Sequence, residues 1–318
     1  MPFLLLNESE VRNLLTMDMA LEAVEDGLRK LGIDEAVNIP RARSQTDHAM
    51  LHVMSAAAKT IGALGYKAYT TSKKGANFHV SLFDGKTGEL TAILQADYLG
   101  QMRTGAASGV ATKYLARPDA ATVGLYGTGK QARTQLLAVC KVRTINQVHV
   151  FSRNEENRRA FCAEMAPLCQ CPVEPAAKPE DAARNKDIVI TATSSREPVL
   201  FGQWLSDGAH LNIVGSNFIS KTEIDVATIQ RARAIVVDNK DQAQLEAGDF
   251  REAIDRGVLQ WKDVRELGTL VAGRCKGREH PGHITLFKSL GLAIEDIATA
   301  AKVVAKAKTM NLGRWIEW

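Results

Sequence analysis

The hydrophobic and polar positions of this chain follow two different patterns. Between residues 17 and 32 apolar side chains recur at helical spacing, which predicts an amphipathic helix. From about residue 50 to residue 93 short apolar runs alternate with polar residues, which predicts the strands of an antiparallel sheet. The expected strands are 51–54, 65–70, 78–83 and 89–94. A helix rich in small residues is expected at 97–116.

From residue 120 to about residue 239 apolar strands alternate with helical segments. This order predicts a doubly wound, mostly parallel sheet. The expected strands are 122–126, 147–151, 173–175, 187–191, 210–214 and 234–237. Further helices are expected at 240–257 and 262–267. A last helix at 293–308 has one apolar stripe and is expected to pack against the first part of the chain.

Composition narrows the class of protein. Of the 318 residues, 45% are hydrophobic and 24% are charged, which is typical of a globular protein. The net charge of +4 is too small to indicate binding to nucleic acid. We expect no membrane partner and a cytoplasmic location, and we interpret residues 1–6 as an edge strand rather than an export signal. An odd count of five cysteines argues against a disulfide framework. No metal site is expected from Cys169 and Cys171, since no second pair or suitably spaced histidine accompanies them.

The most informative motif is a glycine fingerprint. The apolar run 122–126 leads into Gly127-Thr128-Gly129-Lys130-Gln131-Ala132, and a helical segment follows. Gly127 permits the tight turn, Gly129 lets the backbone approach phosphates, and Ala132 allows close packing of helix on strand. The segment therefore predicts a dinucleotide-binding α/β domain of the Rossmann type, with Lys130 and Gln131 also at the phosphates.

The end of the next strand indicates which dinucleotide binds. Ser152, Arg153 and Asn154 follow the strand 147–151, where an NAD site usually carries an acidic residue for the ribose 2′-hydroxyl. An arginine instead pairs with a 2′-phosphate. The sequence thus favours NADP(H) over NAD(H), with Ser152 and Asn154 as further hydrogen-bonding partners. The alternative is that Arg153 only precedes the following helix.

Several segments together resemble the ornithine cyclodeaminase/μ-crystallin family. Arg103-Thr104-Gly105-Ala106 and Phe287-Lys288-Ser289 are distinctive among dinucleotide-binding proteins. The matching segments are 97–107, the glycine fingerprint, 214–217, 221–225 and 284–291. They occur in the family's order over nearly the whole chain.

The resemblance implies a homodimer and an architecture. Residues 1–116 and 293–318 would form a discontinuous α+β domain for substrate binding and dimerisation, and residues 117–292 the Rossmann domain. The family includes cyclodeaminases, alanine dehydrogenases, ketimine and pyrroline-2-carboxylate reductases, and thyroid-hormone-binding crystallins. All of these use or bind NAD(H) or NADP(H).

The resemblance also assigns a substrate site. Arg103 would bind the substrate carboxylate or contact the cofactor, with Arg43 and Lys67 beside it, because a planar arginine suits a carboxylate. Arg41 competes with Arg43 for this role. Leu290 is expected at the substrate. Thr193 and Ser194 follow one strand and would face the cofactor, and Val214 and Gly215 end the next strand and would lie near the nicotinamide. Lys221 and Ser289 complete the expected cofactor site, with Ser289 on the carboxamide side.

Asn217 departs from the cyclodeaminase pattern. Cyclodeaminases place an aspartate here as the acid/base, whereas an amide cannot exchange a proton at physiological pH. We expect Asn217 to orient a substrate or a water. Reduction of a C=N bond needs less proton transfer, so the leading hypothesis is an NADPH-dependent reductase of an α-imino acid, cyclic or formed from a 2-oxo acid and an amine. The alternatives are a cyclodeaminase that uses another group, such as Glu223 or Asp225, and a crystallin-like protein that binds nucleotide without turnover.

Overall fold

The computed structural model describes residues 2–317, which form two compact units. Unit 1 contains the chain up to Thr104 together with the residues from Gly291 onward, and unit 2 contains Gly105–Leu290. The first change of unit falls inside the long helix α3 (Asp97–Leu115). The sequence analysis expected these changes near residues 116 and 293. A helix made of small residues gives no break in the pattern that would mark a boundary.

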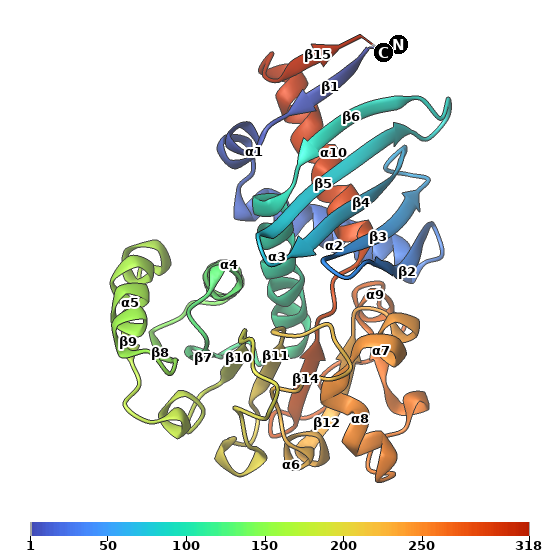
Figure 1. Ribbon diagram of the computed structural model, residues 1–318. Helices are drawn as coiled ribbons and strands as arrows, with labels where there is room; N and C mark the ends of the chain where they lie inside the picture. Colours follow the sequence, from blue (N-terminus) through green and yellow to red (C-terminus); the bar gives the residue numbers. More distant parts are fainter. Residues whose placement is uncertain (1, 318) are drawn as a thin grey trace. The chain divides into compact units, whose positions relative to one another are not determined.

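Unit 1 is built on a seven-stranded sheet in the order β15-β1-β6-β5-β4-β3-β2 (Figure 1). Its strands are β1 (Phe3–Leu6), β2 (Ala36–Gln45), β3 (Ala49–Ala58), β4 (Ala63–Ser72), β5 (Gly75–Asp84), β6 (Leu90–Gln95) and β15 (Arg314–Ile316). The strands β3 to β6 form the expected antiparallel meander, and β2, which the sequence analysis did not predict, pairs antiparallel with β3. The prediction that β1 is an edge strand is wrong, because β15 pairs with its outer side.

The helices α1 (Glu8–Leu14), α2 (Met17–Gly32) and α10 (Ala293–Thr309) complete unit 1 (Figure 1). The helix α10 packs on α2 and against β3, β4 and β5, as its apolar stripe predicted. Gly65 of β4 makes this approach possible, since a Cβ there would lie 2.8 Å from the Ile297 side chain. The opposite face of the sheet exposes Val37, Ile39 and Leu64.

Unit 2 is a doubly wound sheet of eight parallel strands in the order β13-β12-β14-β11-β10-β7-β8-β9 (Figure 1). The strands are β7 (Thr122–Tyr126), β8 (Gln147–Phe151), β9 (Val173–Pro175), β10 (Ile188–Thr191), β11 (His210–Ile213), β12 (Ala232–Val237), β13 (Arg265–Glu266) and β14 (Ile284–Lys288). The predicted Rossmann-type α/β fold is confirmed. The chain leaves β7 toward β8 on one side, and β10 lies on the other side of β7. The carboxyl ends of β7 and β10 therefore mark the switch point where such sheets bind ligands.

The helices of unit 2 are α4 (Lys130–Val142), α5 (Glu155–Cys169), α6 (Val226–Arg231), α7 (Lys240–Glu246), α8 (Gly248–Asp255) and α9 (Leu267–Val271). The prediction of a helix at 262–267 is wrong, because a short 3₁₀ turn at Trp261–Asp263 precedes β13 there. The strand β14 was not expected, although it is buried along its whole length. Nowhere in residues 2–317 does a helix combine the length and apolarity that a membrane crossing needs.

Candidate functional site

A crevice of about 720 Å³ opens at the carboxyl ends of β7, β8, β10 and β11, all in unit 2. It lies where the strand order reverses, as expected for a dinucleotide. Every residue predicted to bind the cofactor lines this crevice except Ser289. These residues are Gly127, Gly129, Lys130, Gln131, Ser152, Arg153, Asn154, Thr193, Ser194, Val214, Gly215 and Lys221. Ser289 is buried, and its N–H donates to the Ile213 carbonyl at 3.0 Å.

The two glycines of the fingerprint have different roles. Gly127 has φ +106°, and a Cβ there would collide with the Ala192 carbonyl, so this residue is required by the backbone itself. Gly129 is extended, and apart from its neighbours along the chain no described residue has an atom within 4 Å of where its Cβ would be. Gly129 is also the N-cap of α4, which receives no side-chain cap from the described chain. The open space and the free helix N-terminus fit a phosphate group.

The segment after β8 carries one positively charged residue, Arg153, that could contact the adenosine end of a nucleotide. Asn154 caps α5, since its Oδ1 accepts from the Asn157 N–H at 2.8 Å, and the Ser152 hydroxyl donates to the Asn154 carbonyl at 3.0 Å. Arg153 is exposed and lines the crevice. Arg153 is thus the residue whose charge can meet a 2′-phosphate, and Ser152 and Asn154 first serve the local turn.

A buried carboxylate joins the two strand ends at the inner part of the crevice. Glu223 is 0% exposed, and its side chain accepts from Thr191 Oγ1, from Thr193 N and Oγ1, and from Gly215 N, each at 2.7 Å. Burial raises the pKa of Glu223, as does the nearby Asp249, while Lys288 and the threonines act in the opposite direction. Asp225, by contrast, caps α6 by accepting from the Thr228 N–H at 2.9 Å. The sequence analysis had named both residues as alternative acid/base groups.

Unit 1 holds a buried cluster of charges. Lys67 Nζ lies 2.8 Å from Asp296 Oδ1, and Arg103 donates to Asp296 Oδ1 at 2.9 Å and to Glu295 Oε2 at 2.8 Å. All four side chains are at most 7% exposed. Burial lowers the pKa of Lys67 to about 8, against the opposing effect of Asp296. Burial also works against the charge of Arg103, but Asp296 and Glu295 hold its pKa well above its ordinary range.

One of the two candidate arginines of β2 lies at this cluster. Arg41 is buried, donates to the Gly291 carbonyl at 3.2 Å, and acts electrostatically on Lys67. Arg43 is half-buried and pairs in register with His52 of β3. Burial, then Arg43 and Arg41, lower the pKa of His52 to about 4, so that this ring is neutral at pH 7. The inward residue is thus Arg41, because a bulge between Ile39 and Ala42 resets the register of β2.

An aromatic row crosses the same sheet face. His52, Tyr69 and Phe78 are successive register partners on β3, β4 and β5. The rings of His52 and Tyr69 are stacked with centroids 4.2 Å apart, and those of Tyr69 and Phe78 with centroids 5.0 Å apart. Lys67 Nζ lies 5.6 Å from the Phe78 centroid. The row places flat apolar surface beside the buried cations, whereas His79 is exposed and contacts Tyr66 instead.

Two predicted site residues have other surroundings. The Leu290 side chain belongs to the buried core of unit 2, and its N–H donates to Asp238 Oδ2 at 2.6 Å. Asn217 is half-buried in the loop after β11, between the buried Ser216 and the exposed Phe218. The structure thus brings Lys67, Arg103 and Arg41 together, while Leu290 acts as a core residue.

The sequence analysis missed Glu295 and Asp296. Both lie in the first turn of α10, where acidic residues are ordinary partners of the helix dipole, so nothing in the pattern distinguishes them. The available signal was the position of two carboxylates on a face otherwise filled by alanine, isoleucine and valine. In the structure they are completely buried against cations.

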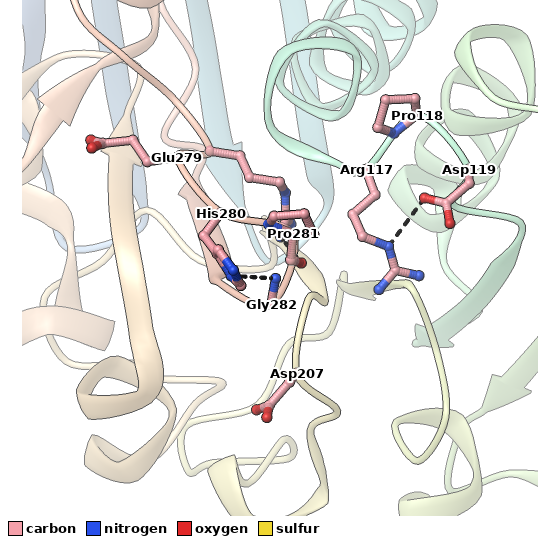
Figure 2. A pocket seen from close by; sticks show the side chains of 9 residues that line it. Arg117, Pro118, Asp119, Asp207, Glu279, His280, Pro281 and Gly282 are labelled. Atoms are coloured by element: carbon pink, nitrogen blue, oxygen red, sulfur yellow. Dashed lines mark hydrogen bonds and ion pairs between the residues drawn. The ribbon is translucent and has the colours of Figure 1, made fainter.

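A second pocket of unit 2, of about 660 Å³, lies at the amino ends of β7, β11 and β14 (Figure 2). Its charges are already engaged with one another and with the backbone. Arg117 pairs with Asp119 and Asp187, and Arg278 donates to the carbonyls of Leu115, Pro281, His283 and Ala209. His280 Nδ1 accepts from the Gly282 N–H (Figure 2). These ion pairs and hydrogen bonds therefore connect the loops around the pocket, at the edge of the sheet opposite the crevice.

Comparison with known proteins agrees with this geometry. Residues 3–311 match the model of the ornithine cyclodeaminase/mu-crystallin family. A Δ1-pyrroline-2-carboxylate reductase of Bacillus cereus is 35% identical, over 99% of this chain and 100% of that protein. The structure of the Thermococcus litoralis Δ1-pyrroline-2-carboxylate reductase with NADH and L-proline has a TM-score of 0.94 at 36% identity, over 98% of this chain and 99% of that one.

An archaeal alanine dehydrogenase dimer with bound NAD has a TM-score of 0.94 at 32% identity, and each chain is covered completely. These relatives share the fold of both units and the whole length of the chain. The likeness therefore extends beyond the glycine fingerprint, which many unrelated proteins carry. The chain belongs to the ornithine cyclodeaminase/mu-crystallin family.

Proposed function

We propose that this protein is an NAD(P)H-dependent oxidoreductase that reduces the C=N bond of an α-imino acid to give an amino acid. The observation that carries the proposal is the excess of positive charge in unit 1. Lys67, Arg103 and Arg41 are buried together, and among the described residues the anions that pair with this group are Glu295 and Asp296. A cluster with a surplus cation is costly to bury, and a substrate carboxylate would offset that cost.

The crevice of unit 2 supports the cofactor assignment. The free N-terminus of α4 and the space at Gly129 fit the pyrophosphate, and relatives are known with NADH or NAD bound. We further propose NADP(H) as the preferred form, because Arg153 supplies a cation where NAD sites usually carry an acid. The bound cofactor would supply the hydride.

The residues of unit 1 would bind the substrate and supply a proton. Arginine side chains would hold the carboxylate. Lys67, whose pKa is about 8, is charged at neutral pH but can release its proton, so it suits protonation of an imine or product nitrogen. The aromatic row from His52 to Phe78 would contact the apolar part of the substrate, which favours compact substrates such as pyrroline-2-carboxylate or piperideine-2-carboxylate.

Cyclodeamination is less well supported. It requires proton transfer at two amines, and the residue at the expected position is Asn217. Glu223 and Asp225 were considered as substitutes, but Glu223 already accepts four hydrogen bonds and Asp225 caps α6. Glu223 has no acceptor position left for a substrate amine, and Asp225 is not among the residues that line the crevice.

A substrate panel tests the proposal. The purified protein is mixed with NADPH or NADH and with pyrroline-2-carboxylate, piperideine-2-carboxylate, or pyruvate with ammonia or methylamine, and nucleotide absorbance is followed. We expect oxidation of NADPH with at least one cyclic imino acid, and its loss in Arg103→Met. Release of ammonia from ornithine would instead indicate a cyclodeaminase. Nucleotide binding with no turnover of any substrate would indicate a carrier protein.

We also propose that the protein forms a homodimer through the outer face of the unit 1 sheet. That face exposes Val37, Ile39 and Leu64, around a shallow groove of about 290 Å³ that also contains Tyr66 and Phe83. Apolar patches on a sheet commonly mark subunit contacts, and a related alanine dehydrogenase is a dimer. Sedimentation of the wild type and of Ile39→Glu tests this, since the charged variant should shift toward monomer.

A further inference from the structure

Glu223 accepts hydrogen bonds from Thr193 and Gly215, two residues that line the crevice, so their donors point toward this buried carboxylate. Its Oε1 accepts both donors of Thr193, the N–H and the hydroxyl, and its Oε2 accepts the Gly215 N–H and the Thr191 hydroxyl, each at 2.7 Å. A carboxylate has about four acceptor positions, so all of them are used. Glu223 is therefore a link between the ends of β10 and β11, with no capacity left for a substrate.

A second layer holds Glu223 in place. The Glu223 N–H donates to Asp249 Oδ1 at 2.6 Å, and Lys288 Nζ lies 2.8 Å from Asp249 Oδ2. The same ammonium donates to the Ser216 carbonyl at 2.7 Å, next to Gly215. The side chains of Lys288 and Asp249 are 0% exposed. Such a buried network of hydrogen bonds and an ion pair fixes the geometry of the segments it joins.

Gly215 is part of this arrangement because it has no side chain. A Cβ at this position would collide with Glu223 Oε1 and with the Thr193 carbonyl. The carboxylate therefore occupies the space beside Gly215, and the Thr193 carbonyl approaches it from the other strand. Both Thr193 and Gly215 line the crevice. The Thr193 hydroxyl also accepts from the Ser195 N–H at 3.2 Å. With their donors engaged by Glu223, these two residues can therefore offer a ligand chiefly carbonyl oxygens, which are acceptors.

We propose that Glu223 is a positioning residue for the nicotinamide end of the cofactor. By engaging the donors of Thr193 and Gly215, it leaves that wall of the crevice lined with acceptors, which suits the NH₂ of a carboxamide and disfavours a carboxylate. The inference rests on the proposed cofactor and adds a discrimination to it. The site should distinguish nicotinamide dinucleotides from the same nucleotides carrying nicotinic acid.

Binding titrations test this without turnover. The affinity of the wild type for NADP⁺ and for its nicotinic acid analogue is measured by calorimetry, and likewise for NAD⁺ and its analogue. We expect the amide form to bind about 10- to 100-fold more tightly, the usual effect of one mismatched polar contact in a buried site. In Glu223→Gln an NH₂ group replaces one of the two acceptor oxygens. A threonine hydroxyl can no longer donate to that atom, so the hydroxyl must rotate and its hydrogen becomes available to a ligand in the crevice. The preference should then fall to a few-fold.

Two further measurements separate positioning from general loss of structure. Hydrogen exchange of the Thr193 and Gly215 amides, without ligand, should accelerate in Glu223→Gln and stay unchanged in Glu197→Gln, an exposed glutamate of the same segment. If Glu223→Gln does not fold, Thr193→Val removes the hydroxyl at nearly constant volume and should reduce the preference in the same way. Equal affinity of the wild type for amide and acid forms, or an unchanged preference in a folded variant, would overturn the inference. Absence of any nucleotide binding would overturn the proposed function instead.

Discussion

Lys67 and Asp296 form a buried ion pair, with Nζ 2.8 Å from Oδ1 and side chains 3% and 0% exposed. The same carboxylate oxygen accepts from Arg103 Nε at 2.9 Å. One anion therefore compensates two cations that burial would otherwise destabilise. The first turn of α10 thereby holds β4 and α3 by charge as well as by packing.

Asp296→Asn should destabilise the protein by about 3–5 kcal/mol, because it leaves two buried cations with less compensation. Urea unfolding followed by circular dichroism measures this. The control is Glu22→Gln, which breaks the Lys302–Glu22 pair in the same unit, where Glu22 is 72% exposed. An exposed pair contributes roughly 0–1 kcal/mol. Equal losses in the two variants would contradict the view that Asp296 stabilises a buried cluster.

The pKa of Lys67, about 8, predicts how the reaction depends on pH. If Lys67 supplies the proton for imine reduction, kcat/KM should fall above pH 8, approaching about tenfold per pH unit. Lys67→Arg keeps the charge at all accessible pH values. Its profile should be lower but without the Lys67-dependent fall, so that the titration of the substrate itself remains. Identical profiles for the two proteins would remove Lys67 as the proton source.

The same pKa also affects stability. Burial lowers the Lys67 pKa from 10.5 to about 8, so between these pH values the unfolded chain binds the proton and the folded protein does not. The contribution of Lys67 to stability therefore rises as the pH increases from about 8 to about 10.5, by up to ~3 kcal/mol. The measurement is the difference between wild type and Lys67→Met in urea unfolding across that range. A difference that does not change with pH would show that Lys67 has an ordinary pKa.

Local chemistry made the nucleotide half of the protein predictable. The fingerprint at Gly127 and Gly129 requires a strand, a turn and a helix within a few residues, and the structure has β7 and α4 there. The strands β7, β8 and β9 have the expected bounds. The strand β7 is a buried apolar run, as is typical of parallel strands covered on both faces, and β8 alternates buried and half-buried residues. The strand β14 escaped notice since its sequence, Ile284–Lys288, ends in a lysine that the fold buries against Asp249.

Long-range pairing made the other half harder to predict. Whether Arg41 or Arg43 points inward depends on a bulge in β2, and a register shift of this kind is not visible in the sequence. Glu295 and Asp296 resemble ordinary acidic residues at a helix start, and only their pairing with Arg103 and Lys67 distinguishes them. Glu223 likewise became informative only when Thr193 and Gly215 proved to share it.

Substitution by alanine should affect a different property at each of the two fingerprint glycines: stability at Gly127 and nucleotide binding at Gly129. Gly127→Ala places a Cβ against the Ala192 carbonyl at φ +106°, so it should lower the unfolding free energy by about 1–3 kcal/mol. At Gly129 the described chain leaves the position of a Cβ open. Gly129→Ala should therefore keep wild-type stability without nucleotide but bind nucleotide about tenfold more weakly, because the methyl group takes the space of the phosphate. Thermal unfolding with and without NADPH distinguishes the two, and destabilisation of apo Gly129→Ala would contradict the phosphate assignment.

Arg153 should determine the choice between the two dinucleotides. Its guanidinium is exposed at the end of β8, while Ser152 and Asn154 are engaged in the turn and the cap of α5. Arg153→Ala should raise the Kd for NADPH about 10- to 100-fold, as expected for loss of a charge-assisted contact to a phosphate, and change the Kd for NADH little. Arg159→Ala is the matched control, because Arg159 is 72% exposed on α5 and pairs with the exposed Glu155 of the same helix. Fluorescence titration at two salt concentrations measures both constants, and the NADPH preference of the wild type should weaken as salt increases. If NADH binds more tightly than NADPH in the wild type, Arg153 only precedes α5 and does not select the nucleotide.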